Sequence, residues 1–415
     1  MSPLSLALTS LAARWNSALE RELPAAEELR RELHREPRLS GSEHPTTARL
    51  VAALSDAVRV ESVADAGGVG RIGPSDGPAI AIRAELDALP LAEATGAEFR
   101  SGNGAMHACG HDVHQAALVA LVRAAEGLEL PLGLVTLLQP REESYPSGAL
   151  DMVEAGVLDR WAVAHVIGAH VHPGVRPGAV ASGGGFINAA ADEIDIRVHG
   201  RGGHAAYPHL ASDTVAAIAQ IALSLPEVTR RTVSPLRPAL ISIGTLSAGE
   251  GAANVLPGEG RVFATMRTTD PADRQPLFEA VRRMVEHVAA AFGVQADVLR
   301  IEGEPALIND VYLAADADDW LARLGVDGAE PMRSLGADDF SYFCAEVPSL
   351  MMFVGVETPD RDPQPSLHDP HFLPDDSAVG AVARALLAGY LAAAERVLGI
   401  EHHRSDFTER EEARA

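Results

Sequence analysis

The spacing of apolar residues changes twice along the chain and divides it into three stretches. In the first stretch, short apolar runs alternate with segments of helical periodicity. The predicted strands are residues 79–83, 132–138 and 166–170, and the predicted helices are residues 10–35, 115–126 and 147–155. Strands that alternate with helices predict a parallel or mostly parallel sheet covered on both faces.

Near residue 186 the pattern changes to an alternation of apolar and polar residues, which is typical of half-buried strands. The predicted strands are residues 193–199, 239–247, 261–267 and 295–301, and the predicted helices are residues 212–225 and 271–292. The resulting order, β-α-β-β-α-β, is that of a small ferredoxin-like domain.

Helix and strand signals return after residue 305 and end in an Ala/Leu-rich helix at residues 376–398. We therefore predict an α/β domain formed by residues 1–186 and 303–400, interrupted by an inserted domain of residues 187–302. The charged residues 401–415 are expected to form a flexible tail.

Composition narrows the range of functions. The chain has 415 residues, of which 47% are hydrophobic, and this length allows a sizeable core. It carries 34 basic and 58 acidic residues, a net charge of −24, and no lysine. Without lysine, Schiff-base chemistry, pyridoxal attachment and Walker-type phosphate binding are excluded. This excess of acidic residues argues against nucleic-acid and anionic-membrane partners, because a protein that binds either one needs basic surface patches.

Neither a membrane span nor an export signal is expected. No stretch offers the ~20 apolar residues that are expected of a segment that crosses a bilayer. Residues 1–22 fit an amphipathic helix better than a signal peptide, because no basic region precedes their apolar run. Cys109 and Cys344 are too few for a disulfide framework. The expected location is therefore the cytoplasm.

Side chains that can bind metal ions are concentrated in residues 106–114, whose sequence is Met-His-Ala-Cys-Gly-His-Asp-Val-His. This segment comes directly before a predicted helix, whose formation does not require such residues. Thiolate and imidazole are the ligands that zinc and similar ions prefer. A polar loop with a chance cysteine is the alternative interpretation.

Two glutamates, Glu142 and Glu143, follow the strand at residues 132–138. Open α/β sheets place their sites at the carboxyl ends of strands. In an extended segment neighbouring side chains point in opposite directions, so one carboxylate could ligate a metal while the other acts as a base. Two solvated loop glutamates are the alternative.

Histidines occur at two further positions of this kind. His170 and His172 end the strand that begins at residue 166, and His368 and His371 lie shortly before the last helix. One or more of them could ligate a metal. A surface pair in the first case, and turn chemistry around Asp-Pro in the second, are the alternatives.

Taken together, these segments resemble the metal-dependent amidohydrolases that include aminoacylases, hippurate hydrolases, N-acetyl amino acid deacetylases and plant auxin-conjugate hydrolases. The resemblance extends from about Leu33 to Ala394, and its motifs recur in the family's order. They are His-Arg-x-Pro-x-Leu-Ser (34–40), Arg-Ala-x-x-Asp-Ala-Leu-Pro (83–90), His-Ala-Cys-Gly-His-Asp (107–112), Gln-Pro-x-Glu-Glu (139–143), Gly-x-His (168–170), Gly-x-Gly-Gly-His-x-x-x-Pro-His (200–209), Asn-Val-x-Pro (254–257), Gly-Ala-x-Asp-Phe (336–340) and Leu-His-x-Pro-x-Phe (367–372).

The resemblance implies a zinc-peptidase-like catalytic domain with a mixed, mostly parallel sheet, and an inserted ferredoxin-like domain that serves as dimerisation domain and lid. It also implies a site for two divalent metal ions, with zinc, manganese, cobalt and nickel all compatible with the ligands. By this resemblance Cys109 bridges both ions, His111 and Glu143 complete the site of one ion, and His170 and His368 complete the other.

Further roles follow from the resemblance. Glu142 matches the general base, which takes a proton from a metal-activated water and delivers it to the leaving amine nitrogen. Asp87 and Asp112 are candidates for holding the other ring nitrogen of a ligand histidine. A strand-end cap is the alternative for Asp87.

The inserted domain contributes a second set of candidates. The resemblance implies that His204 reaches across a homodimer into the partner's active site and helps to stabilise the oxyanion. Asn254 and Arg267 match positions near the substrate, with a sheet-surface arginine as the alternative for Arg267. His209 is expected to be a helix-start or dimer-contact residue.

The sequence also departs from the family pattern at three places. Glu85 stands where the family usually has Asp, Val113 stands where it has Gly, and Ser144-Tyr-Pro-Ser147 replaces a run of glycines. The last change adds bulk next to the expected metal site, so the shape of the substrate pocket does not follow from the resemblance.

The leading hypothesis is an amidohydrolase that cleaves small N-acyl amino acids or related amides. A dipeptidase or carboxypeptidase with the same dinuclear site is the second hypothesis, and an inactive dimeric binding protein is the third. The resemblance implies a homodimer formed through the inserted domain, and neither nucleic acid nor membrane is an expected partner.

Overall fold

The computed structural model describes residues 2–56, 58–249 and 251–400, and these residues form two compact units. The first unit comprises the residues up to Gly185, Asn309–Met332 and the residues from Glu346 onward. The second comprises Phe186–Ile308 and Arg333–Ala345. The predicted tail at 401–415 lies outside the described residues.

The second unit is larger than the expected insertion of residues 187–302. It also takes in residues 303–308 and 333–345. Main-chain contacts explain the later segment, because Ser334 N–H donates to the Ile187 carbonyl at 2.9 Å and Ala189 N–H donates to the Gly336 carbonyl at 3.0 Å. Irregular backbone of this kind gives no periodic signal, so the sequence pattern does not place residues 333–345 in this unit.

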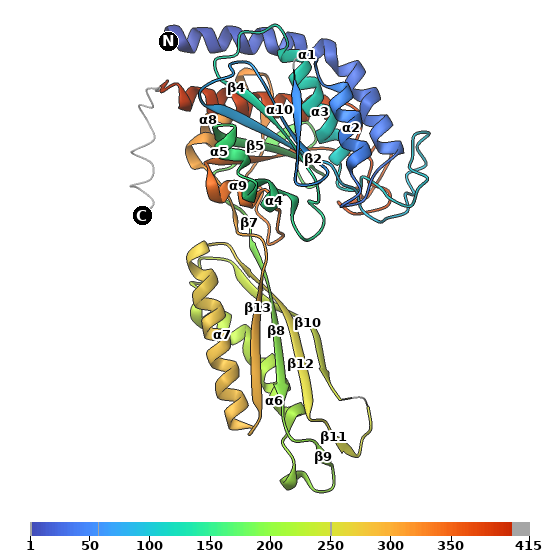
Figure 1. The fold of residues 1–415 in the computed structure, drawn as a ribbon, viewed down its shortest axis with the longest axis vertical. Coiled ribbons are helices and arrows are strands. Elements are labelled where there is room, and N and C mark those ends of the chain that lie inside the picture. Colours follow the sequence, from blue (N-terminus) through green and yellow to red (C-terminus); the bar gives the residue numbers. More distant parts are fainter. Residues whose placement is uncertain (1, 57, 250, 401–415) are drawn as a thin grey trace. The chain divides into compact units, whose positions relative to one another are not determined.

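The first unit is built on a mixed sheet, which has eight strands in the described part of the chain (Figure 1). In spatial order they are β1 (Arg59–Val63), β2 (Gly67–Ile72), β4 (Gly133–Gln139), β3 (Ala79–Glu85), β5 (Val163–His172), β16 (Ser349–Gly355), β6 (Ala179–Ala181) and β15 (Asp327–Gly328). The central run β4-β3-β5-β16 is parallel. The β1 and β2 strands pair antiparallel with their neighbours, whereas β6 is antiparallel to β16 and parallel to β15. The predicted α/β class with a mostly parallel sheet is confirmed.

Helices pack against this sheet and complete the core. They are α1 (Pro3–Arg35), α2 (His44–Ala53), α3 (His111–Ala125), α4 (Gly148–Glu154), α5 (Val157–Arg160), α8 (Val311–Arg323) and α10 (Ala378–Val397). The α1, α3 and α10 helices lie together along one side of the sheet (Figure 1). Trp15 of α1 contacts both other helices. Its Nε1 donates to the Leu121 carbonyl of α3 at 3.0 Å, and its ring packs edge-to-face with that of Tyr390 in α10. Every residue of β3 and β4 is buried, as a sheet covered on both faces requires.

The α10 helix corrects one expectation. Among the described residues it alone is long and apolar enough to cross a membrane by length and composition, although no such stretch was expected from the sequence. In the structure 89% of its apolar window is buried against the rest of the unit. Burial of this kind is typical of a core helix that is hydrophobic all round.

The second unit contains a sheet with four strands in the described residues, all antiparallel, in the order β10 (Ala239–Ala248), β12 (Glu259–Thr268), β8 (Ala190–His199) and β13 (Gln295–Glu302). Its long helices are α6 (Thr214–Thr232) and α7 (Pro271–Ala291), which pack on the sheet around Ile194, Ile196 and Val198. The chain order β8-α6-β10-β12-α7-β13 is the ferredoxin-like order that the alternation predicted. The shorter elements are β7 (Gly185–Asn188), β9 (Gly203–His204), η1 (Pro208–Leu210), β11 (Val255–Leu256), β14 (Leu307–Asn309) and α9 (Ser341–Glu346).

Candidate metal centre

Three neighbouring parallel strands deliver polar side chains to one edge of the larger sheet. Asp87 lies just beyond β3, Glu142 and Glu143 lie just beyond β4, and His170 lies near the end of β5. Because carboxyl ends of parallel strands meet at the same edge, residues more than 80 positions apart in the sequence come together there.

The turn that enters α3 supplies two more groups, Cys109 and His111. Gly110 is the N-cap of the helix and has φ 82°, in the left-handed region that favours glycine. A Cβ built on Gly110 would lie 2.4 Å from Cγ2 of Val171, so the close approach of β5 also requires glycine. The helix was predicted to begin at residue 115, but it begins at His111 because its first turn is polar and buried rather than apolar.

The structure brings all the predicted ligands together in overlapping groups. In each group the ligand atoms lie within 4.8 Å of one another. The groups are Cys109, His111 and His170; Cys109, Glu143 and His368; and His111, Glu142 and Glu143. Cys109 belongs to two of these groups, one with His111 and His170 and one with Glu143 and His368, which is the arrangement that a bridging thiolate would need.

The ring of His111 is oriented so that Nε2 can bind a metal ion. Its Nδ1 donates to the main-chain carbonyl of Asp87 at 2.9 Å, while its buried Nε2 has no hydrogen-bond partner among the described residues. Burial opposes a charged ring, yet the carboxylates of Asp87, Glu85 and Glu143 outweigh it and raise the pKa of His111 to about 9. The site therefore favours positive charge on this nitrogen, and a cation fits it.

His170 and Cys109 face each other. Nδ1 of His170 donates to the carbonyl of Val171 at 2.7 Å, and its Nε2 lies 3.4 Å from Sγ of Cys109. Burial, with the neighbouring His114, lowers the pKa of His170 and keeps the ring neutral. Burial, followed by the charges of Glu143 and Glu142, raises the pKa of the Cys109 thiol. A thiolate at this position therefore needs cations beside it, which agrees with the metal-bridging interpretation.

The segment that carries the glutamates is not extended, which corrects the argument for their opposite directions. The β4 strand ends at Gln139, and Arg141 has φ 50° in the turn that follows. Both carboxylates reach the same cluster. Oε2 of Glu142 lies 3.7 Å from Nε2 of His111, and Oε1 of Glu143 lies 3.2 Å from Nε2 of His368. Their different partners, rather than strand alternation, distinguish them.

His368 comes from the loop before α10. Its backbone has φ 65°, and its N–H donates to the Ala108 carbonyl at 3.0 Å, which fixes the loop beside the Cys109 turn. The Glu143 carboxylate raises the pKa of His368 despite partial burial. His172 and His371 lie outside the groups of candidate ligands in the described residues.

Asp87 contacts two of the candidate metal ligands, His111 and Glu143. Its carbonyl accepts from His111, and its Oδ2 accepts from Ser40 Oγ at 2.7 Å and from the N–H of Glu143 at 2.9 Å. The side chain therefore positions Glu143, while the main chain orients His111. Burial raises the pKa of the carboxyl, but the contact of its Oδ1 with Nδ1 of His111 at 3.6 Å and the hydrogen bonds from Ser40 and Glu143 outweigh burial, so the pKa is lowered.

Asp112 does not hold a ligand histidine as expected. Its Oδ2 accepts from Nε of Arg30 at 2.8 Å and from Nδ1 of His34 at 2.9 Å. Burial is outweighed by Arg30 and His34, so the pKa of Asp112 is depressed. The carboxylate therefore joins α1 to the first turn of α3, a role that the sequence could not indicate because Arg30 and Asp112 are 82 residues apart.

The remaining predicted residues belong to the second unit. His204 in β9 is exposed, and its Nδ1 accepts from the N–H of Ala206 at 3.1 Å. The carbonyl of Asn254 accepts from Ala205 N–H at 3.0 Å, so these two segments lie side by side. Arg267 is half-buried in β12, opposite Leu240 and Ala191.

Sequence reasoning missed two buried residues beside the ligands. In the sequence Glu85 stands out only as a departure from a motif, and no motif assigns a role to His114. Both are buried, and Nδ1 of His114 lies 2.9 Å from Oε2 of Glu85. His114 follows His111 by three residues, which is about one helical turn. This spacing could have indicated that the two side chains lie on the same face of the helix.

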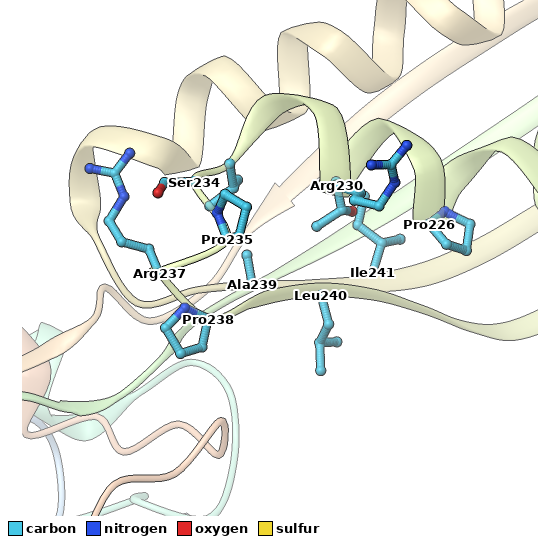
Figure 2. Close-up of a pocket in the computed structure, with 11 residues that line it drawn as sticks. Pro226, Arg230, Ser234, Pro235, Arg237, Pro238, Ala239, Leu240 and Ile241 are labelled. Atoms are coloured by element: carbon cyan, nitrogen blue, oxygen red, sulfur yellow. The ribbon is translucent and has the colours of Figure 1, made fainter.

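The second unit has a hollow of about 370 Å³ that contains none of the predicted site residues (Figure 2). It lies between the end of α6 and the start of β10. The labelled Arg230 and Arg237 border it, but they are paired with Glu227 and with Asp270 and Asp273. The hollow therefore presents no convergent polar groups comparable with those around Cys109.

Comparison with known proteins agrees with the geometry. A family model described as Peptidase family M20/M25/M40 matches residues 81–389. The N-acetyl-L-cysteine deacetylase of Bacillus subtilis is 34% identical over 369 residues, which cover 88% of this chain and 86% of that protein. Thermostable carboxypeptidase 2 of Saccharolobus solfataricus is 33% identical over 374 residues, covering 87% and 94%.

A solved structure is similar over nearly the same length. It is that of a dinuclear metal-binding peptidase from the M20 family of Bacillus subtilis, with 30% identity and a TM-score of 0.77. The match covers 90% of this chain and 98% of that protein.

Proposed function

The chain belongs to peptidase family M20/M25/M40, a family of metal-dependent hydrolases that act on amide C–N bonds, and we propose from this premise that it hydrolyses small N-acyl amino acids or related amides. The observation that carries the proposal is the convergence of a cysteine, three histidines and two glutamates at one sheet edge. A deacetylase among the relatives supports an acylated amino acid as substrate.

We assign Cys109, His111, Glu143, His170 and His368 as the residues that hold two divalent ions. The thiolate, imidazole and carboxylate donors suit zinc, manganese, cobalt or nickel. When bound, such ions lower the pKa of a water towards ~7 and polarise the scissile carbonyl. Nδ1 of His170 and Nδ1 of His111 each donate to a main-chain carbonyl, so both rings are oriented in the absence of metal.

Glu142 is assigned as the general base. Its carboxylate lies at the edge of the ligand cluster, 3.7 Å from Nε2 of His111, and is partly exposed, so it can face both the cluster and a substrate. It accepts the proton of the attacking water on a carboxylate oxygen. It then gives that proton to the amine nitrogen as the C–N bond breaks, which avoids expelling an amide anion.

The second unit is assigned to substrate recognition in a homodimer. An exposed histidine such as His204, carried on a two-stranded β9–β11 ribbon, can act on a neighbouring subunit as an oxyanion donor. Asn254 and Arg267 complete this assignment as substrate-binding groups.

A substrate panel tests the proposal. Purified enzyme is incubated with N-acetyl and N-benzoyl amino acids and, separately, with dipeptides, with chelator and metal-restored controls. Release of free amino acid from the acylated series, abolished by chelator and restored by metal, is the expected result. Exclusive cleavage of dipeptides would instead support a peptidase, which the similarity to a carboxypeptidase favours. Tight binding without turnover would favour a binding protein and contradict both.

A further inference from the structure

A chain of hydrogen bonds runs behind His170 and involves residues that the proposed mechanism does not use. Glu85, at the end of β3, is buried and forms an ion pair with Arg83. Oε2 of Glu85 lies 2.9 Å from Nδ1 of His114 in α3. Nε2 of His114 lies 3.0 Å from the main-chain N–H of Val171 in β5.

The backbone donor fixes the tautomer of His114. An amide N–H can only donate, so Nε2 of His114 accepts and carries no proton. The ring proton is therefore on Nδ1, where it points at the carboxylate of Glu85. Both nitrogens of His114 are occupied, which rules it out as a metal ligand although it lies within 4.8 Å of Glu85 and His170 ligand atoms.

Val171 connects His114 to the metal centre. Its N–H donates to His114, and its carbonyl accepts from Nδ1 of His170 at 2.7 Å. The rings of His114 and His170 also pack edge-to-face, with centroids 4.6 Å apart. The carbonyl that orients the His170 ring and the N–H that His114 accepts therefore both belong to Val171, in the two peptide units on either side of its Cα.

We propose that His114, oriented by Glu85, is a positioning residue for His170, and that it acts through the backbone of Val171 to direct Nε2 of His170 at the metal centre. The inference rests on the proposed metal site. The side chain at position 85 must be long enough for its carboxylate to contact both Arg83 on its own strand and His114 on the facing helix.

The test compares two polar substitutions of His114. His114→Gln places an amide oxygen near the position of Nε2, so it can still accept from Val171. His114→Asn ends near the position of Nδ1, so it can reach Glu85 but not Val171. Both variants keep a polar group in the buried site and are expected to fold. His165→Gln is the matched control, because His165 is a buried histidine of β5, the strand of His170 and Val171, but its Nδ1 contacts the Pro348 carbonyl instead.

Cobalt(II) affinity is measured for metal-free wild type and each variant by competition with a chelator, and the cobalt absorption spectrum is recorded. Loss of a group that orients a ligand typically weakens metal affinity by about 10–100-fold, and this loss is expected at one of the two sites in His114→Asn. His114→Gln and His165→Gln should bind both ions as wild type does, with an unchanged spectrum.

The outcomes separate this inference from the proposed function. If wild type binds no cobalt, the metal site itself is wrong. If wild type binds two ions and His114→Asn binds them equally well, only the positioning role is overturned. Equal weakening in His114→Gln and His114→Asn would also overturn it, because acceptance from Val171 would then not be the property that matters.

Discussion

His111 donates from Nδ1 to the main-chain carbonyl of Asp87 across 2.9 Å, so a residue of α3 is oriented by the backbone that follows β3. The contact leaves Nε2 directed at Glu142 and Cys109, with no hydrogen-bond partner in the described residues. In the metal-free protein this nitrogen holds a proton at neutral pH, because the pKa of His111 is raised to about 9. Metal binding must displace that proton.

The first prediction is a pH dependence of metal-free stability. The folded-state pKa of about 9 exceeds the unfolded value of 6.5, so the stabilisation is complete below pH 6.5 and is lost as pH rises through 9. Relative to His111→Gln, wild type in chelator should lose about 3 kcal/mol of unfolding free energy between pH 6.5 and 9.5. Denaturant titrations at several pH values measure it. Parallel pH profiles for the two proteins would contradict the raised pKa.

The second prediction distinguishes Glu142 from Glu143. Glu143→Gln should lose metal, because Oε1 of Glu143 faces His368 and its main chain is tied to Asp87. Glu142→Gln should retain metal while turnover falls at least ~100-fold, the usual scale for a general base. Metal analysis and steady-state kinetics of both variants check this. If Glu142→Gln is the variant that loses metal, the two roles are exchanged.

The third prediction concerns Glu43, the buried residue at the N-cap of α2. Its Oε1 accepts from the N–H of Arg141 at 2.9 Å, in the turn that carries both catalytic-site glutamates. Glu43→Gln keeps an acceptor and should behave like wild type. Glu43→Ala leaves the N–H unpaired and should cost about 1–3 kcal/mol of stability. The looser turn should also lower metal occupancy. Identical unfolding free energies and metal contents for the two variants would show that Glu43 does not hold the turn.

The fourth prediction is catalysis across a dimer. His204→Ala should keep both metals but lose ~100-fold or more in turnover, as removal of an oxyanion donor usually does. Mixing it with Glu142→Gln, under conditions that exchange subunits, should restore activity, because a mixed dimer has one site with an intact base and a donated His204. If exchange is demonstrated but activity does not return, His204 does not act in trans.

The sequence predicted the parts of the structure that periodicity and motifs report. The strands at β3, β4 and β5 and the β-α-β-β-α-β order of the second unit are confirmed by the structure. The α3 helix was predicted four residues short, because its polar first turn carries His111, Asp112 and His114 and lacks apolar spacing.

Contacts between distant segments could not be predicted in the same way. The pairing of Asp112 with Arg30 crosses 82 residues, and the contact between His114 and Val171 crosses 57. Neither partner belongs to a pattern that links it to the other. The short β1 and β2 hairpin and the grouping of residues 333–345 with the second unit also lacked a periodic signal.

Titration of metal-free enzyme with divalent ions tests the central claim most directly, with release of amino acid from an N-acyl substrate followed at each step. Wild type should be inactive without metal and reach full rate at two ions per chain. Cys109→Ser is the matched control and should fold yet fail to bind two ions or recover activity, because the bridging sulfur is gone. Hydrolysis that proceeds without metal, or Cys109→Ser protein with full occupancy and near-normal turnover, would contradict a dinuclear site bridged by Cys109.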